Sequence, residues 1–204
     1  MIILEHWETF NFDGAMRGMR NPMNSWHKGD TSGQSLGLGQ NDLDLLLRLT
    51  KAGTDHRKTL RQMLVGVDIT APLYWWKEFD TYKVGTVANS CSTMHKLTAK
   101  PFELADFSTD GMSEDGAAKV ELQTIVLNEL RELWLENKQK NNWRDMVCLL
   151  PCSYNQKRTV TLNYEVLLNM YFARRRHKLQ EWRDFCEAVM ELPYFKEIAE
   201  AAGK

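Results

Sequence analysis

The sequence predicts an α+β fold in a single domain that spans residues 1–204. Two observations favour this class. Apolar residues recur at helical spacing in several long segments, and residues 63–69 alternate apolar and polar side chains, as a strand with one buried face does. A chain of 204 residues is long enough to bury one substantial core, and its length does not demand a second domain.

The charge balance and the first residues predict a cytoplasmic protein. With 26 basic and 27 acidic residues the net charge is −1, so no overall field attracts nucleic acid or an anionic membrane. We therefore expect neither as a partner. The opening MIILEHWETFNFDG lacks the basic and apolar regions of a secretory signal, and the chain contains no long uninterrupted apolar stretch.

Four cysteines, Cys91, Cys148, Cys152 and Cys186, match no common zinc spacing and suit reduced thiols in the cytosol. Cys148 and Cys152 form the closest pair, but Pro151 lies between them and no second pair or histidine cluster follows. We interpret them as small core residues and expect no metal site.

The first forty residues are rich in glycine and short polar residues, which predicts a loop-rich segment. A helix then begins near Asn41, with Asp42 as its cap, and ends near Gly53. A second short helix is expected from Asp55.

The predicted strand at 63–69 ends at Ala71-Pro72, because proline lacks a donor for the sheet but fits the first turn of a helix. An aromatic helix is expected over 73–82. The polar stretch VGTVANSCST after it either lines a site or forms a turn. Residues 95–116 predict an irregular segment.

Apolar spacing predicts further helices over 122–136 and 143–150, the second stopped by Pro151. A short β-branched strand follows at 159–162. From Asn163 we expect a long helical stretch that reaches Val189, in which one side is shared by positions 163, 167, 170, 171, 174 and 178.

The C-terminal stretch LPCSYNQKRTVTLNYEVLLNMYFARRRHKLQEW carries six elements in a definite order: Leu150-Pro151, Thr161, Asn163, Asn169, Arg174 and Gln180. Their order and spacing resemble those of the flavin-dependent thymidylate synthases, in the helix that faces flavin and nucleotide. The resemblance implies an α+β subunit with a small antiparallel sheet and long helices, assembled as a homotetramer that holds FAD where subunits meet.

By this resemblance Asn163 and Asn169 contact FAD, Arg174 binds and polarises the pyrimidine as the catalytic residue, and Gln180 contacts the substrate. Arginine suits that role because its planar donors hold a carbonyl or phosphate and stay charged when desolvated. The alternative is that residues 174–178, Arg-Arg-Arg-His-Lys, form a solvated basic face or a contact between subunits.

A second stretch resembles the same family more weakly. His56 lies where the family has a flavin-contacting histidine, and Thr81-Tyr82-Lys83 aligns with its Arg-His-Arg triplet, so Tyr82 and Lys83 are assigned to the cofactor. Thr86, Asn89 and Cys91 follow at positions that contact the nucleotide. A Cys91 thiolate that attacks pyrimidine C6 is a weaker alternative, because the sequence shows no cation to activate it.

Two cations of the family pattern are replaced here, one of them by Val147. Candidate replacements are Arg144, Lys157, Arg158, and Arg175 or Arg176. The N-terminal run AMRGMRNPMNSWHK occupies the place of a polar family loop that contacts phosphate and flavin; with Arg20 it forms either an anion site for the substrate or a basic glycine-rich turn.

The sequence thus favours a divergent flavin-dependent enzyme that methylates a pyrimidine nucleotide at C5, of the dUMP to dTMP type. The resemblance implies FAD as cofactor, with NADPH and methylenetetrahydrofolate as co-substrates. The alternative is a non-catalytic protein that binds or sequesters a nucleotide on the same oligomeric fold, motivated by the altered Arg-His-Arg triplet.

Overall fold

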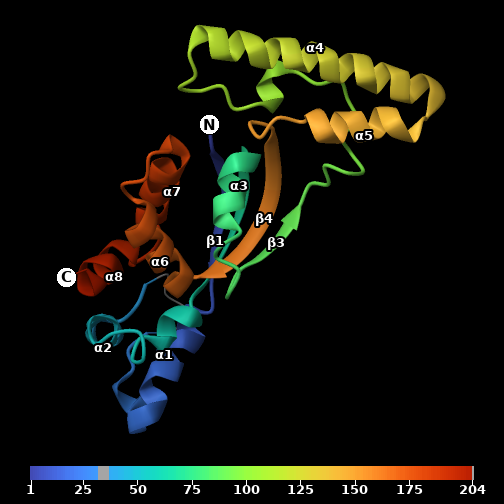
Figure 1. Cartoon of the computed structure of the whole chain (residues 1–204). Coiled ribbons are helices and arrows are strands. Elements are labelled where there is room, and N and C mark those ends of the chain that lie inside the picture. Colours follow the sequence, from blue (N-terminus) through green and yellow to red (C-terminus); the bar gives the residue numbers. More distant parts are fainter. Residues whose placement is uncertain (32–36, 204) are drawn as a thin grey trace. The chain divides into compact units, whose positions relative to one another are not determined.

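The computed structural model describes residues 1–31 and 37–203 (Figure 1). Within these residues one antiparallel sheet contains four strands, in the order β1 (Ile3–Phe10), β2 (Leu64–Pro72), β4 (Asn155–Asn163) and β3 (Val87–Ser90). Long helices accompany it. The predicted α+β class, with a small antiparallel sheet and long helices, is therefore confirmed.

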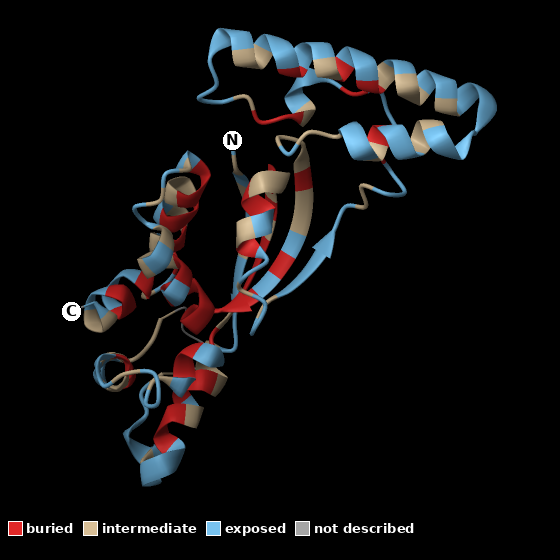
Figure 2. Ribbon diagram, viewed as in Figure 1, coloured by how far each residue is buried: buried red, intermediate tan, exposed pale blue. Residues whose placement is uncertain are grey.

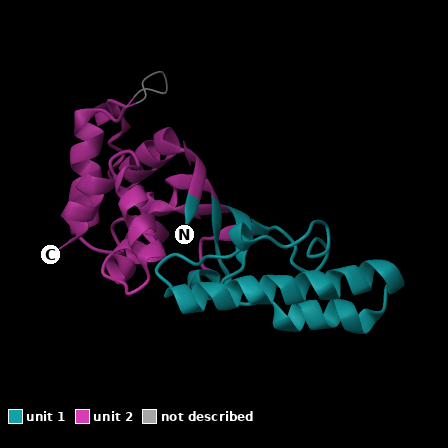
Figure 3. Ribbon diagram, turned by 90° about the horizontal axis from the view of Figure 1, so that it is seen from above, with its two compact units in different colours: residues 1–3, 69–81, 89–159 teal, residues 4–68, 82–88, 160–204 magenta. Residues whose placement is uncertain are grey.

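The chain forms two compact units (Figure 3). The first consists of Met1–Ile3, Ile69–Thr81 and Asn89–Thr159, and the second of Leu4–Asp68, Tyr82–Ala88 and Val160–Lys204. All four strands of the sheet contribute residues to both units.

The second unit contains five α-helices among its described residues: α1 (Phe12–Arg20), α2 (Gln40–Lys51), α6 (Tyr164–Arg174), α7 (Gln180–Met190) and α8 (Phe195–Ala202). Short 3-10 turns lie at Asn21–Met23, Trp26–Lys28 and Lys58–Arg61. Helix α2 packs against α8, and α6 against α7. Buried residues concentrate on α6, where Leu167, Leu168 and Met170 have no exposed surface (Figure 2).

The first unit contains α3 (Leu73–Phe79), α4 (Glu114–Asn137), α5 (Lys140–Leu149) and a 3-10 turn at Leu104–Asp106. Helix α4 packs against α5 over a core that includes Phe102, Phe107, Leu127 and Met146. Apolar residues also lie on the exposed side of α4, where Leu122 is 62% and Ile125 is 53% exposed. This side of α4 is thus an apolar surface in the single chain.

Several predicted elements are confirmed. The alternating segment forms β2 from Leu64 onward, and the apolar residues Met63, just before the strand, Val65, Val67 and Ile69 are at most 2% exposed. Pro72 ends the strand and precedes α3. The aromatic side of α3 belongs to the core, where Trp75, Trp76 and Phe79 pack ring to ring at 4.9–5.1 Å. Helices α4 and α5 lie where apolar spacing predicted them.

Four expectations were wrong. The loop-rich prediction for the first forty residues is wrong where they form β1 and α1, and its part over residues 32–36 lies outside the described residues. Asp42 does not cap α2, which begins after Gly39; its carboxylate turns inward instead. The short helix expected at Asp55 is a 3-10 turn that begins at Lys58. The long helical stretch is broken between Arg174 and Gln180, so position 178 lies outside α6 and does not share its side.

No helix in the described part of the chain is both long enough and apolar enough to span a bilayer.

Candidate functional site

Helix α6, with its cap, positions three of the family-like residues, Asn163, Asn169 and Arg174. Asn163 is its N-cap, and the side-chain Oδ1 accepts a hydrogen bond from Val166 N at 3.0 Å. Asparagine is favoured here because its oxygen satisfies one of the unpaired amides of the first turn. Asn169 is exposed in the middle of the helix, and Arg174 is its last residue. Asn163 is therefore already used by the helix through its oxygen, and its Nδ2 remains as a donor.

Gly85 packs directly on the start of this helix. A Cβ atom at Gly85 would lie 2.7 Å from Asn163 Nδ2 and 3.2 Å from a Val166 methyl group, and the backbone has φ of +80°. Both the close approach and the left-handed conformation favour glycine. The turn at Gly85 thus belongs to the wall around Asn163.

Tyr82, three residues before Gly85, contacts the other end of α6. The Nε of Arg174 donates to the Tyr82 hydroxyl at 3.0 Å, and the guanidinium carbon lies 4.9 Å from the centroid of the Trp182 ring. An α-helix of 11 residues is about 16 Å long. Residues 82–85 contact both ends of this helix. Because a helical side chain tilts toward the N-terminus of its helix, a long arginine at the last position reduces the distance between these two contacts.

Two more predicted residues lie in the same segment. Thr86 turns its hydroxyl into the protein, where Oγ1 is buried without a hydrogen-bond partner. Lys83 is exposed, and its carbonyl accepts a long hydrogen bond of 3.4 Å from Thr86 N. The structure therefore brings Tyr82 and Gly85 to the helix that carries Asn163 and Arg174, and Thr86 follows Gly85 in sequence.

His56 is exposed in the turn that follows Gly53, and its amide donates to Gly53 O at 3.0 Å. The next residue, Arg57, forms a largely buried ion pair with Glu165 in the first turn of α6, with Nε 2.9 Å from Oε2. This ion pair fixes the His56 turn to the same end of α6 as Asn163.

Gln180 is exposed and begins α7. Its Nε2 donates to Asp184 Oδ1 at 2.6 Å, and its Oε1 accepts from Arg183 Nε at 3.1 Å. Both ends of the amide are thus engaged within its own helix.

Arg20, at the end of α1, is 5% exposed and binds Asp42 through Nε at 2.6 Å. The other oxygen of Asp42 accepts from the backbone amides of Asp30 and Thr31. Burial opposes ionisation of Asp42, but the hydrogen bonds from Thr31, Arg20 and Asp30 outweigh it, so the pKa of this carboxyl is lowered. The predicted ligand-binding arginine is engaged in a buried ion pair.

Asn89 and Cys91 belong to the first unit. Asn89 is exposed on β3, and Cys91 follows the strand with its amide bound to Lys157 O at 2.9 Å. The carbonyl of Cys91 accepts from Gln156 Nε2 at 2.8 Å. The backbone at Cys91 is therefore anchored to β4, while its thiol is exposed.

The candidate replacement cations differ in their surroundings. Arg158 stacks on Trp76 at 4.1 Å and binds Asp80 Oδ1 at 2.8 Å, which gives it a structural role. Arg175 lies over the rings of Tyr171 and Phe172 at 5.4 and 5.1 Å. Arg144 is exposed on α5, and Lys157 is half-buried on β4.

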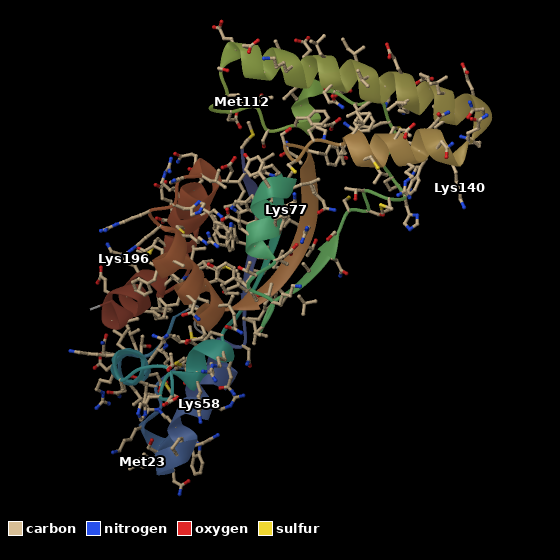
Figure 4. All side chains as sticks on the ribbon, viewed as in Figure 1. Met23, Lys58, Lys77, Met112, Lys140 and Lys196 are labelled. Carbon is tan, nitrogen blue, oxygen red and sulfur yellow. The ribbon has the colours of Figure 1, made fainter. Side chains whose placement is uncertain are left out.

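The interpretation of Cys148 and Cys152 as core residues was wrong, because both are exposed. Cys152 Sγ accepts a hydrogen bond from Lys77 Nζ at 3.2 Å, and Lys77 is labelled on α3 in Figure 4. Among the described residues, no group of three or more potential ligands could hold a metal ion. Cys186 is buried, which raises the pKa of its thiol to about 12 against the opposing charges of Arg174 and Arg175.

Sequence reasoning missed Trp182, His177 and Gly85 as parts of this site. Trp182 is fully buried on α7, and the His177 ring lies 6.4 Å from it in an edge-on arrangement. His177 Nδ1 accepts from Leu179 N at 3.2 Å, so its ring supports the connection between α6 and α7. The sequence signal that could have indicated Trp182 as a site residue was its position two residues after Gln180, which belongs to the family-like pattern.

These elements define an α+β protein with a polar and aromatic site built on α6. No family model matches the chain, and no curated protein is similar to it in sequence. Its fold is that of thymidylate synthase X, a flavin-dependent thymidylate synthase, as two solved structures from Helicobacter pylori show, each with FAD and dUMP. The first has a TM-score of 0.75 at 19% identity and covers 100% of this chain and 99% of that chain. The second has a TM-score of 0.74 at 20% identity and covers 98% of each.

Proposed function

We propose that this chain is a divergent flavin-dependent enzyme that methylates a pyrimidine nucleotide at C5, of the dUMP to dTMP type, with methylenetetrahydrofolate and NADPH as co-substrates. The observation that carries the proposal is the arrangement on α6: Tyr82 holds Arg174 at one end, and Gly85 packs on Asn163 at the other. The fold shared over the full length with structures that contain FAD and dUMP supports it.

The residues proposed to hold FAD are His56, Tyr82, Lys83, Asn163 and Asn169. They fit such a ligand, because His56, Lys83 and Asn169 present exposed polar side chains and Asn163 keeps Nδ2 as a donor. The Thr86 hydroxyl, buried without a hydrogen-bond partner, is a further polar group in the same segment as Tyr82 and Lys83. When bound, the flavin supplies the reducing equivalents of the methylation.

Arg174 is proposed to bind and polarise the pyrimidine, because a guanidinium held in place stabilises negative charge that develops on a ring oxygen. Thr86, Asn89, Cys91 and Gln180 are proposed to complete the substrate site. Arg20 is proposed to contribute to the substrate site indirectly, because its side chain is buried. Its ion pair with Asp42 supports the backbone at Asp30 and Thr31.

The proposed working form is a homotetramer of single-domain subunits, residues 1–204, in the cytoplasm. The exposed apolar side of α4 supports assembly, because surfaces of this kind mark contacts between proteins. Sedimentation equilibrium of the purified chain tests it, and a monomer at micromolar concentration would contradict it.

The proposed activity is tested by the absorbance spectrum of the purified protein and by titration with FAD. We expect the absorption band of oxidised flavin and formation of dTMP from dUMP when both co-substrates are supplied. Absence of the band together with no binding on titration would overturn the proposal.

A second candidate function is a non-catalytic protein that binds a nucleotide. It is favoured by Val147, which is half-buried against the core between α4 and α5 where the family pattern has an arginine. Mass spectrometry of ligands released from the purified protein would then find a nucleotide other than FAD. Steady production of dTMP would exclude this function.

A further inference from the structure

Tyr82 and Trp182 enclose the guanidinium of Arg174 from two directions. Tyr82 accepts from Arg174 Nε at 3.0 Å, and the guanidinium carbon of Arg174 lies over the Trp182 ring, 4.9 Å from its centroid. The two rings also contact each other in an edge-on arrangement, with centroids 6.1 Å apart. The hydrogen bond to Tyr82 and the aromatic surface of Trp182 therefore both hold Arg174.

Trp182 is itself fixed by the core. It is fully buried on α7, where the Phe185 ring lies 5.9 Å away. Helix α6 ends at Arg174 and α7 begins at Gln180, and the two helices pack against each other, so that a residue eight positions after Arg174 contacts its guanidinium. Trp182 is thus a rigid surface for the arginine.

These contacts reduce the conformational freedom of the arginine before any ligand arrives. An arginine side chain carries about 2 kcal/mol of rotamer entropy, which a ligand would otherwise have to overcome. A cation over an indole ring and a hydrogen bond to a hydroxyl both stabilise one orientation. A preorganised arginine binds more tightly and polarises more strongly than a mobile one.

We propose that Tyr82 and Trp182 are positioning residues for Arg174, Tyr82 through the Nε hydrogen bond and Trp182 through the face of its ring. Tyr82 acts on Arg174 whether or not it also touches a cofactor. The inference rests on the proposed function only for the identity of the ligand that Arg174 binds.

The first test observes Arg174 directly, without any ligand. In the wild-type protein, we expect the Nε–Hε group of Arg174 to give a separate NMR resonance that exchanges slowly with water, because it donates to the Tyr82 hydroxyl. Tyr82→Phe removes the acceptor, and we expect the exchange of this proton to accelerate at least tenfold. Arg158 is the matched control, because its Nε donates to Gln156 Oε1 at 3.0 Å and should be unaffected. An unchanged Arg174 resonance in Tyr82→Phe would overturn the proposal.

The second test uses dUMP as the probe and exploits the difference between tyrosine and histidine. In Tyr82→Phe we expect dUMP affinity to fall about tenfold at every pH. A neutral histidine accepts from Arg174 Nε, whereas a protonated one only donates and repels the guanidinium. Tyr82→His should therefore bind dUMP nearly as wild type at about pH 8 and as weakly as Tyr82→Phe, or more weakly, at about pH 5.5.

Groups near Arg174 that also carry or change charge include His177, Arg175 and Cys186, and Lys83 is next to Tyr82 in sequence. All four are present in the wild-type protein, so its own pH profile is the control. Wild-type affinity in Tyr82→Phe, or a Tyr82→His profile parallel to wild type, would overturn the positioning role. If wild type binds no dUMP, the proposed function fails while the NMR test still decides the positioning role.

Discussion

Arg20 and Arg174 have the same chemistry but are held differently in the folded chain. Arg20 is 5% exposed and binds the carboxylate of Asp42, while Arg174 is half-buried and donates through the same atom, Nε, to the hydroxyl of Tyr82. From sequence both were candidates for binding the substrate.

The difference shows that the bonding partner of an arginine and the burial of the pair decide whether the arginine stabilises the fold or remains able to bind a ligand. The Arg20–Asp42 pair also engages the amides of Asp30 and Thr31, so it fixes the backbone before α2. The Tyr82–Arg174 contact instead orients a cation beside aromatic rings at a helix end. We therefore expect changes around Arg20 to affect stability first, and changes around Arg174 to affect binding first.

The largest effect is expected from Asp42→Asn. The substitution keeps the shape of the side chain but leaves the charge of Arg20 buried without its counter-charge, which should lower the free energy of unfolding by about 3–5 kcal/mol. Urea unfolding measures this. Asp44→Asn is the matched control, because Asp44 is exposed on the same helix and should change stability by about 0.5 kcal/mol or less. Equal effects of the two substitutions would contradict a stabilising role of the ion pair.

Arg174→Ala tests the expectation that changes around Arg174 affect ligand binding before they affect stability. We expect it to weaken dUMP binding by about 1.5–3 kcal/mol, roughly ten- to 150-fold, because one charge-assisted contact is lost. The free energy of unfolding should change by about 1 kcal/mol or less, since the side chain is only half-buried. Calorimetric titration and urea unfolding of the same preparation separate the two. A large loss of stability or of assembly with intact binding would make Arg174 a structural residue.

The fold was predictable where burial alternates with exposure along a strand or helix. Strand β2 was found because Met63, Val65, Val67 and Ile69 all face the core. Strand β1 was missed because it lies at the edge of the sheet and most of its residues are exposed, so its sequence ILEHWETF shows no clear apolar alternation. Helix α1 contains Gly14 and Gly18, which usually indicate loops.

The sequence could predict the residues of the candidate site that lie near one another in sequence, but not the contacts between distant residues. Asn163 and Arg174 lie on one helix, so their spacing was visible in the sequence. The contact between Tyr82 and Arg174 joins residues 92 positions apart, and local pattern carries no information on it. The helix break after Arg174 contains neither glycine nor proline, so the propensities of residues 175–179 gave no warning of it.

The acid sensitivity of the fold should also separate the two arginines. The pKa of Asp42 is lower in the folded chain than in the unfolded one, so its ionised form stabilises the fold above about pH 4. This contribution is lost as the pH falls through the lowered pKa. The stability difference between wild type and Asp42→Asn should therefore stay constant above about pH 5 and shrink as the pH falls below about 4. The difference between wild type and Arg174→Ala should shrink less, and similar curves for both variants would contradict the assignment.

The smallest effect is expected from Thr86→Val, which removes a buried hydroxyl without changing the shape of the side chain. Because Oγ1 has no partner in the folded chain, its removal relieves a desolvation cost, and stability should stay the same or rise by about 1 kcal/mol. If the hydroxyl serves a ligand, dUMP or FAD affinity should fall by about the value of one neutral hydrogen bond, roughly 0.5–1.5 kcal/mol. Thr81→Val is the matched control, because the Thr81 hydroxyl already donates to Glu78 O at 2.8 Å and its residue is exposed. A stabilised Thr86→Val variant with unchanged affinity for both ligands would show that Thr86 is not part of the site. Within residues 82–86, the contact of Tyr82 with Arg174 would then be the feature that acts on nucleotide binding.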